Sequence, residues 1–149
     1  MKKVLVVDDD RDLLEMVEMA LKEQGFQVST LEEGKLFFSQ IRSFEPDVIL
    51  LDVFLNDADG RELCYQLKSD PALKDIPVAL YSAGHMSNST IVKSKANLYI
   101  TKPFDIIRLG EKLKGMLAKG TQKNSETYLD FIRQYIPPYN LARVKLLPR

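Results

Sequence analysis

The chain has 149 residues, 21 of them basic and 21 acidic, so its formal net charge is zero. A length close to that of one domain, with 45% hydrophobic residues, indicates a globular domain with a real core. The balanced charge argues against nonspecific binding to nucleic acid. No apolar run reaches the roughly eighteen residues of a membrane span, and one cysteine cannot form an internal disulfide. Three aspartates follow the first apolar run, which excludes a secretory signal there, so a cytoplasmic protein is expected.

Charge and composition divide the chain near residue 119. Residues 120–149 carry 5 basic and 2 acidic side chains, a net charge of +3, whereas residues 1–119 carry 16 basic and 19 acidic side chains, a net charge of −3. Gly115, Gly120 and the polar residues 121–125 lie near this change, as is typical of a linker. We therefore predict a main domain over residues 1–119, followed by a linker and a short appendage.

Short apolar runs alternate with amphipathic segments along the main domain. Runs rich in apolar and β-branched residues predict five strands, at residues 4–7, 26–31, 48–51, 78–81 and 98–100. Apolar residues at helical spacing predict helices at residues 13–21, 36–41, 60–67 and 106–117. Between the last two strands only Met86, Ile91 and Val92 are candidates for an apolar stripe, so a fourth helix there should be short or loose. This alternation indicates a doubly wound α/β domain, with a parallel sheet and helices on both faces.

Polar side chains follow four of the five predicted strands, at the edge where such sheets bind ligands. They are Asp8, Asp9 and Asp10 after the first strand, Asp52 after the third, Ser82 after the fourth, and Thr101, Lys102 and Pro103 after the fifth. Together these groups suit a single anionic pocket that binds a metal ion.

The chemistry of these groups points to phosphoryl transfer. The carboxylates of Asp8, Asp9 and Asp52 would repel one another strongly if they converged without a partner. Mg²⁺ removes this conflict, because it prefers oxygen ligands and usually combines few carboxylates with waters and phosphate oxygens. A carboxylate can also attack phosphorus and form an acyl phosphate. Lys102 and Ser82 supply a positive charge and a hydroxyl donor for phosphoryl oxygens.

Each of these residues also has a structural interpretation. The aspartates at residues 8–10 could cap the following helix, because Asp is favoured at helix N-termini. Asp52 could be a loop residue, Ser82 an ordinary end of a strand, and Lys102 with Pro103 an ordinary turn. The functional interpretation is favoured because a structural one has to account for four strand ends separately.

Five segments carry motifs of a known family. They are Val4 to Asp10, Pro46 to Asp52, Asp59-Gly60, Pro77-Val78 with Ser82-Ala83, and Tyr99 to Phe104. In order and spacing they resemble the receiver domain of two-component response regulators. The resemblance implies a flavodoxin-like fold, with five parallel strands in the order 2-1-3-4-5.

The resemblance also implies a role for each matching residue. Asp52 corresponds to the phosphoacceptor. Asp8 and Asp9 correspond to the acidic pair that positions Mg²⁺ together with Asp52, and the main-chain carbonyl of Phe54 is a further ligand.

The remaining matches correspond to the residues that respond to phosphorylation. Ser82 corresponds to the switch hydroxyl, and Tyr99 to the aromatic switch whose ring moves inward with it. Lys102 corresponds to the family's lysine, followed by Pro103, often after a cis peptide bond. A half-buried aromatic residue in a strand is the alternative interpretation of Tyr99.

Three features depart from the family's pattern. Asn56 stands where a proline is usual, four residues after Asp52. Only 20 positions separate Ser82 from Lys102, about two fewer than is common, and a polar stretch lies between them. His85, within this stretch, could gate the pocket or sense pH. We favour an exposed loop histidine.

The appendage carries a short apolar stripe at residues 128–136, ended by Pro137 and Pro138. So short an amphipathic helix needs a partner surface. Docking on its own main domain or on a second copy, as a homodimer, is favoured over release to an output partner. Residues 139–149 carry too few charges to argue for nucleic acid. The appendage is also too short for an output domain, so a complete chain would be a stand-alone receiver and a fragment is the alternative.

The favoured function is a phosphorylation switch, in which a histidine kinase or phosphotransfer protein donates a phosphoryl group to Asp52. Such a domain catalyses only its own phosphorylation and dephosphorylation. The alternative is a degenerate receiver that acts as a docking module without phosphorylation. A phosphohydrolase of the haloacid dehalogenase type is disfavoured, because no threonine follows the aspartates at residues 8–12 and no cap domain is available. No Walker-type phosphate loop supports nucleotide hydrolysis.

Overall fold

The computed structural model describes residues 1–84 and 86–118. Its strands are β1 (Lys3–Val7), β2 (Gln27–Leu31), β3 (Val48–Asp52), β4 (Val78–Ser82) and β5 (Leu98–Thr101). Its helices are α1 (Arg11–Glu23), the 3₁₀ turn η1 (Gly34–Leu36), α2 (Phe37–Phe44), α3 (Gly60–Ser69), α4 (Asn88–Ser94) and α5 (Ile106–Ala118). His85 and the predicted appendage lie outside the described residues.

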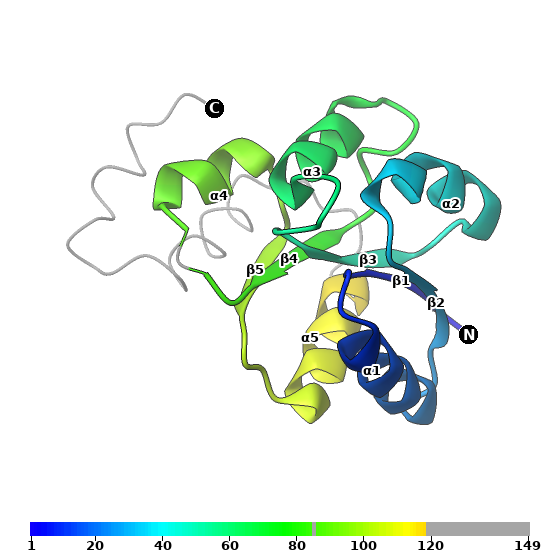
Figure 1. The fold of residues 1–149 in the computed structure, drawn as a ribbon. Helices are drawn as coiled ribbons and strands as arrows, with labels where there is room; N and C mark the ends of the chain where they lie inside the picture. The colour runs from blue at the N-terminus through cyan, green and yellow to red at the C-terminus, as the bar shows by residue number, and fades with distance from the viewer. Residues whose placement is uncertain (85, 119–149) are drawn as a thin grey trace.

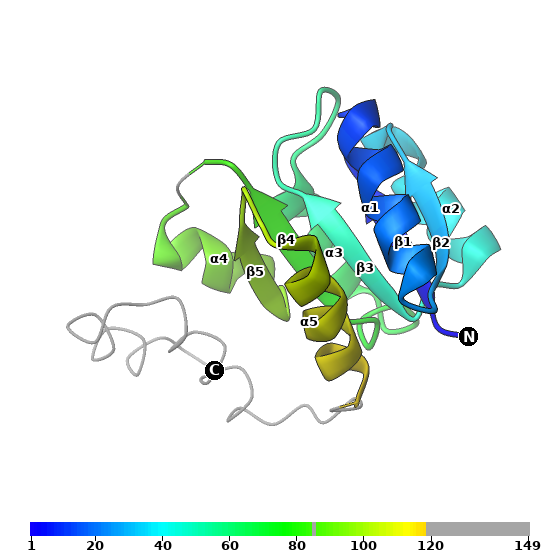
Figure 2. The same ribbon diagram turned by 90° about the horizontal axis from the view of Figure 1, so that it is seen from below.

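The strands form one sheet in the order β2-β1-β3-β4-β5, and every pairing in it is parallel. Helices α1 and α5 cover one face, and α2, α3 and α4 cover the other (Figure 1). Seen from the side of α1 and α5, the two helices lie across the sheet (Figure 2). This confirms the predicted doubly wound fold and its flavodoxin-like strand order.

The central strands explain why the sequence shows apolar runs rather than alternation. All residues of β3 and β4 are buried, and residues 4–7 of β1 have no exposed surface. A parallel strand with helices on both faces must present apolar side chains to both of them. Polar residues are therefore confined to the strand ends, which is where the candidate site residues lie.

Helix α1 has well-defined signals at both ends. The Asp10 side chain accepts a hydrogen bond from the backbone N–H of Leu13 at 3.2 Å and caps the N-terminus. Gly25, with φ of +94°, follows the C-cap in a conformation that favours glycine. Between these ends, Leu14, Val17 and Leu21 are buried against the sheet. The predicted helix and its apolar face are confirmed.

Helix α4 has only seven residues, which confirms the prediction of a short fourth helix. It buries Ile91 and Ser94, while Val92 is half-buried. Its C-cap, Lys95, has a left-handed backbone with φ of 60°. α4 therefore buries fewer apolar side chains than α1.

The second helix differs in detail from the prediction. Leu36 was expected on its apolar face, but the chain forms the η1 turn there and leaves 45% of Leu36 exposed. Phe37 and Ile41, which belong to the same predicted apolar stripe, are buried in α2 as expected. None of the described helices is both long enough and apolar enough to span a membrane.

Candidate functional site

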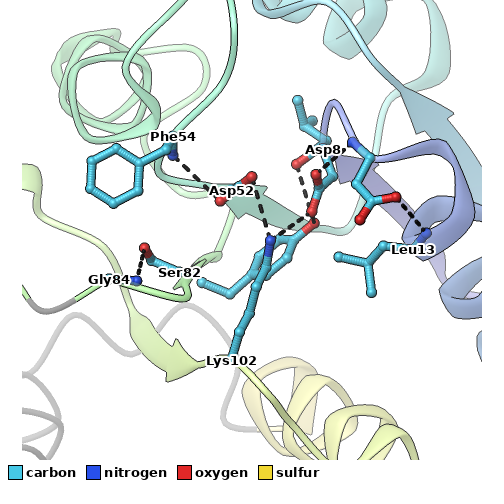
Figure 3. Close-up of polar contacts among 10 residues, drawn as sticks. Asp8, Leu13, Asp52, Phe54, Ser82, Gly84 and Lys102 are labelled. Carbon is cyan, nitrogen blue, oxygen red and sulfur yellow. Dashed lines mark hydrogen bonds and ion pairs between the residues drawn. The ribbon is translucent and has the colours of Figure 1, made fainter.

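The parallel sheet brings the polar strand ends together at one edge. Asp8 directly follows β1, Asp52 is the last residue of β3, Ser82 is the last residue of β4, and Lys102 directly follows β5. Figure 3 shows the Lys102 side chain reaching toward both carboxylates, with Ser82 and Phe54 on the other side of Asp52. The structure thus gathers residues that are far apart in the sequence.

Three carboxylates converge at this edge. Asp8, Asp9 and Asp52 each place one carboxylate oxygen so that these oxygens lie within 4.8 Å of one another. Asp8 and Asp52 are buried, with 1% and 4% of their surface exposed, whereas Asp9 is half-buried. A hard divalent cation with oxygen ligands suits this donor set. We call Asp8, Asp9, Asp52 and Lys102 the acidic half of the site.

Asp8 is held by donors on both carboxylate oxygens. Its Oδ1 accepts a hydrogen bond from the backbone N–H of Asp10 at 2.9 Å. Its Oδ2 accepts hydrogen bonds from the Tyr81 hydroxyl at 2.6 Å and from Lys102 Nζ at 3.0 Å. Burial alone would raise the pKa of Asp8, but these hydrogen bonds, led by that of Tyr81, lower it below its ordinary value. Asp8 is therefore ionised at neutral pH.

Lys102 is the cation of the site. Besides its ion pair with Asp8, its Nζ lies 3.5 Å from Oδ2 of Asp52 and 4.5 Å from the centre of the Tyr81 ring. The Lys102 backbone N–H donates to the carbonyl of Ser82 at 2.8 Å, and a cis peptide bond joins Lys102 to Pro103. One ammonium group thus faces two buried carboxylates, which leaves the acidic half with excess negative charge.

That excess appears in the protonation of Asp52. Burial and the negative charge of Asp8 raise the pKa of Asp52 to about 6, although Lys102 and the Phe54 N–H act in the opposite direction. A bound cation would relieve this repulsion and favour the ionised carboxylate. Asp52 is thus buried, ionises near neutral pH and lies where a further positive charge would be favourable. These properties suit an oxygen nucleophile.

The loop after β3 brings main-chain groups beside Asp52. The Phe54 N–H lies 3.4 Å from Oδ1 of Asp52, so the main chain of Phe54 lies next to the carboxylate. Gly60, at the start of α3, packs against the Asp52 main chain so closely that a Cβ there would collide with the Asp52 carbonyl oxygen. This contact explains why the Asp59-Gly60 motif accompanies the site.

Hydroxyl groups lie on the β4 and β5 side of the site. The buried Ser82 Oγ accepts a hydrogen bond from the Gly84 N–H at 3.0 Å, and the Tyr99 hydroxyl donates to the Gly84 carbonyl at 3.1 Å. Tyr99 is 5% exposed, so its ring lies inward. Burial raises the pKa of Tyr99, while a hydrogen bond with Ser82 acts in the opposite direction. We call Ser82, Gly84 and Tyr99 the hydroxyl half of the site.

The three aspartates at residues 8–10 have two different roles in the structure. Asp10 caps helix α1, which is the alternative role considered for these aspartates, whereas Asp8 and Asp9 lie in the carboxylate cluster. The sequence pattern places Tyr81 only in an apolar strand, although its hydroxyl contacts Asp8. Its one sequence signal is a hydroxyl-bearing aromatic directly before Ser82, in a strand that is otherwise apolar.

A second contact outside the predicted site lies at Asp57. Its carboxylate accepts hydrogen bonds from the backbone N–H groups of Gly34 at 2.9 Å and Lys35 at 3.0 Å. These bonds lower the pKa of Asp57 and tie the loop after β3 to the η1 turn. No sequence pattern indicated this link, because its partners are more than twenty positions apart.

Known proteins share both the sequence and the fold. The model of the response regulator receiver domain matches residues 4–114. The probable transcriptional regulatory protein TcrX of Mycobacterium tuberculosis is 37% identical over 119 residues, which cover 78% of this chain and 50% of TcrX. The phosphate regulon transcriptional regulatory protein PhoB of Pseudomonas aeruginosa is 33% identical over 131 residues, which cover 87% of this chain and 57% of PhoB. The chain thus spans about half the length of these relatives.

Solved structures agree with this assignment. A putative response regulator from Chloroflexus aurantiacus matches with a TM-score of 0.73 and 32% identity, covering 78% of this chain and 98% of that chain. The signal receiver domain of a histidine kinase from Syntrophus aciditrophicus matches with a TM-score of 0.74 and 28% identity, covering 84% and 96%. With its sheet order, its carboxylate cluster and a family match over most of its length, the chain belongs to the receiver domains of two-component response regulators.

Proposed function

We propose that the chain is a phosphoacceptor switch whose acceptor is Asp52. The observation that carries this proposal is the convergence of the Asp8, Asp9 and Asp52 carboxylates with Lys102 beside two of them. A histidine kinase or a phosphotransfer protein would supply the phosphoryl group. A carboxylate oxygen of Asp52 attacks the phosphorus, the bond between phosphorus and the donor histidine nitrogen breaks, and an acyl phosphate forms on Asp52.

Mg²⁺ fits the acidic half, because three carboxylates with one lysine leave negative charge uncompensated. Asp8, Asp9, Asp52 and the Phe54 carbonyl would hold it. Bound there, it supplies positive charge for the carboxylates and the phosphoryl oxygens. Lys102 already lies within 3.5 Å of Asp52, so its ammonium is placed to pair with an added phosphoryl oxygen.

The hydroxyl half would report the phosphorylation. Ser82 would turn its hydroxyl onto the phosphoryl group, and its hydrogen bond from Gly84 would then be exchanged for one to a phosphoryl oxygen. Because Tyr99 bonds the carbonyl of the same Gly84, movement at Ser82 would change the contacts of the Tyr99 ring. The altered surface near α4 would then meet an output protein.

The chain would turn over no external substrate, since only its own aspartate accepts and loses the phosphoryl group. The names of TcrX and PhoB describe transcriptional regulators, but the matched part is the receiver. The net charge of −3 over residues 1–119 favours a protein partner over nucleic acid for this part. A cytoplasmic location fits a partnership with the catalytic part of a histidine kinase.

The test is the intact mass of the full chain after incubation with acetyl phosphate and Mg²⁺. The parent chain should gain one phosphoryl group, and Asp52→Asn should gain none, because an amide is not a nucleophile of this kind. Asp12→Asn removes an exposed carboxylate in the first turn of α1, as a matched control, and should gain the group like the parent.

Two results would contradict the proposal. An adduct on Asp52→Asn would place the acceptor elsewhere. A folded parent chain that binds Mg²⁺ but gains no phosphoryl group would instead favour the docking module, whose partner binding should survive Asp52→Asn. The observation that favours this second function is that α4 is short and buries only Ile91 and Ser94.

A further inference from the structure

Tyr81 is a buried residue beside the site that the proposed chemistry does not use. It lies one position before Ser82 in β4, paired in register with Asp52 of β3, and has no exposed surface. Its hydroxyl lies 2.6 Å from Oδ2 of Asp8 and 3.4 Å from the carbonyl oxygen of Val7. A hydroxyl has one proton to donate, and the shorter contact to a charged acceptor takes it.

The contact with Tyr81 limits what else Asp8 can bind. A carboxylate has about four lone-pair directions. The Asp10 N–H occupies one on Oδ1, and Tyr81 and Lys102 occupy two on Oδ2. The direction left over is therefore on Oδ1. With its plane fixed by donors on both oxygens, the carboxylate cannot rotate to offer a different oxygen.

We propose that Tyr81 is a positioning residue for the acidic half: its hydroxyl fixes the Asp8 carboxylate and thereby raises the affinity of the cluster for Mg²⁺. The inference rests on the proposed function only in requiring that the cluster binds a divalent cation. Outer hydrogen bonds of this kind orient ligating groups, and their loss typically weakens metal binding about 10- to 100-fold.

The alternative is that Tyr81 only fills the core. Its ring packs edge-on against Phe104, with ring centres 5.8 Å apart, and lies under the Lys102 ammonium. A phenylalanine would keep both of these contacts and lose only the hydroxyl. Tyr81→Phe therefore separates the hydroxyl bond to Asp8 from the packing of the ring.

The experiment is calorimetric titration of the full chain with Mg²⁺ at pH 7, for the parent, Tyr81→Phe and Tyr65→Phe. We expect Tyr81→Phe to weaken Mg²⁺ binding about tenfold, as for other outer-shell losses. Tyr65 is 44% exposed on α3 and should leave the affinity unchanged. Because the titration is done on folded protein, a loss of global stability alone would not alter the measured affinity.

Tyr81→Leu is a second variant, which removes the hydroxyl together with the ring contacts, and it should show at least the same loss of affinity. Equal affinity for the parent and either folded variant would overturn the role of Tyr81 and leave Asp52 as the proposed acceptor. A parent chain that binds no Mg²⁺ would overturn both, and the acetyl phosphate experiment would then also fail. The two failures are therefore distinguishable.

Discussion

The acidic half and the hydroxyl half of the site are supported very differently. Asp8 in the acidic half has three hydrogen-bond donors and is followed by α1, which has 13 residues and three buried aliphatic side chains. Ser82 in the hydroxyl half is followed by α4, which has seven residues and buries one aliphatic side chain, Ile91, with Ser94.

This difference fits the separate tasks that the proposed function gives to the two halves. A metal and phosphoryl site requires carboxylates in fixed positions, and the α1 side supplies that rigidity. A switch requires a segment that can change its arrangement for little free energy, and weakly anchored helices open most readily. We therefore expect α4 to open locally at a lower free energy than α1.

Truncation of one aliphatic side chain in each helix tests this comparison with the largest expected loss of stability. Leu21→Ala in α1 should lower the free energy of unfolding by about 3 kcal/mol, because it leaves a cavity in a fully buried position. Ile91→Ala in α4 should lower it by only about 1 kcal/mol, since α4 can undock without unfolding the rest. Urea unfolding measures both values. Equal losses would show that α4 is as firmly integrated as α1.

The charge of the acidic half gives the next contrast, between Asp52→Asn and Ser82→Ala. The folded-state pKa of Asp52, about 6, lies above its ordinary value of 3.8, so its contribution favours folding below pH 3.8 and is lost as the pH rises through 6. Asp8, whose pKa is lowered, stays ionised above pH 5 in the folded and the unfolded chain. It therefore does not make the free energy of unfolding depend on pH in that range. At pH 8 without Mg²⁺, Asp52→Asn should therefore be more stable than the parent by about 3 kcal/mol.

Ser82→Ala should instead lose about 1 kcal/mol at every pH, because it removes neutral hydrogen bonds. Thermal unfolding from pH 5 to pH 8 in the presence of a chelator compares the three proteins. A parent chain with no loss of stability over this range would contradict the repulsion between Asp8 and Asp52.

The helix caps give the smallest contrast. Asp10 caps α1 by accepting from Leu13 N–H, and Ser87 caps α4 by accepting from Thr90 N–H at 3.3 Å. Asp10→Ala should lower the free energy of unfolding by about 1 kcal/mol. Ser87→Ala should cost less than about 0.5 kcal/mol globally, because fraying of α4 absorbs the loss. Hydrogen exchange should show the Ser87→Ala effect confined to residues 88–94, and spread of the effect into β4 would contradict this.

Much of the architecture was predictable because buried parallel strands leave a clear pattern. The unbroken apolar runs at residues 4–7 and 48–51 are typical of strands that are covered on both faces, and both runs are buried. Once the strands were parallel, their carboxyl ends had to share an edge, so the meeting of Asp8, Asp52 and Lys102 followed from topology.

The rest depended on distances that no periodicity encodes. Tyr81 has the pattern of a core residue, and only the register of β4 against β3 brings its hydroxyl to Asp8. Leu36 fits the spacing of an apolar face, yet the chain forms the η1 turn there, beside the contact of Gly34 with Asp57, and Leu36 is exposed. The sequence therefore predicts which elements form, while contacts between distant loops decide their ends.

The link from Asp57 to Gly34 also restricts how this sequence can evolve. A Cβ at Gly34 would lie 2.6 Å from the Cβ of Ala58, and the Asp57 carboxylate would be 3.0 Å away. A side chain at position 34 is therefore compatible only with a rearranged loop at residues 57–58. Position 34 precedes β3 and positions 57–58 follow it. A substitution at Gly34 therefore requires a compensating change at residues 57–58.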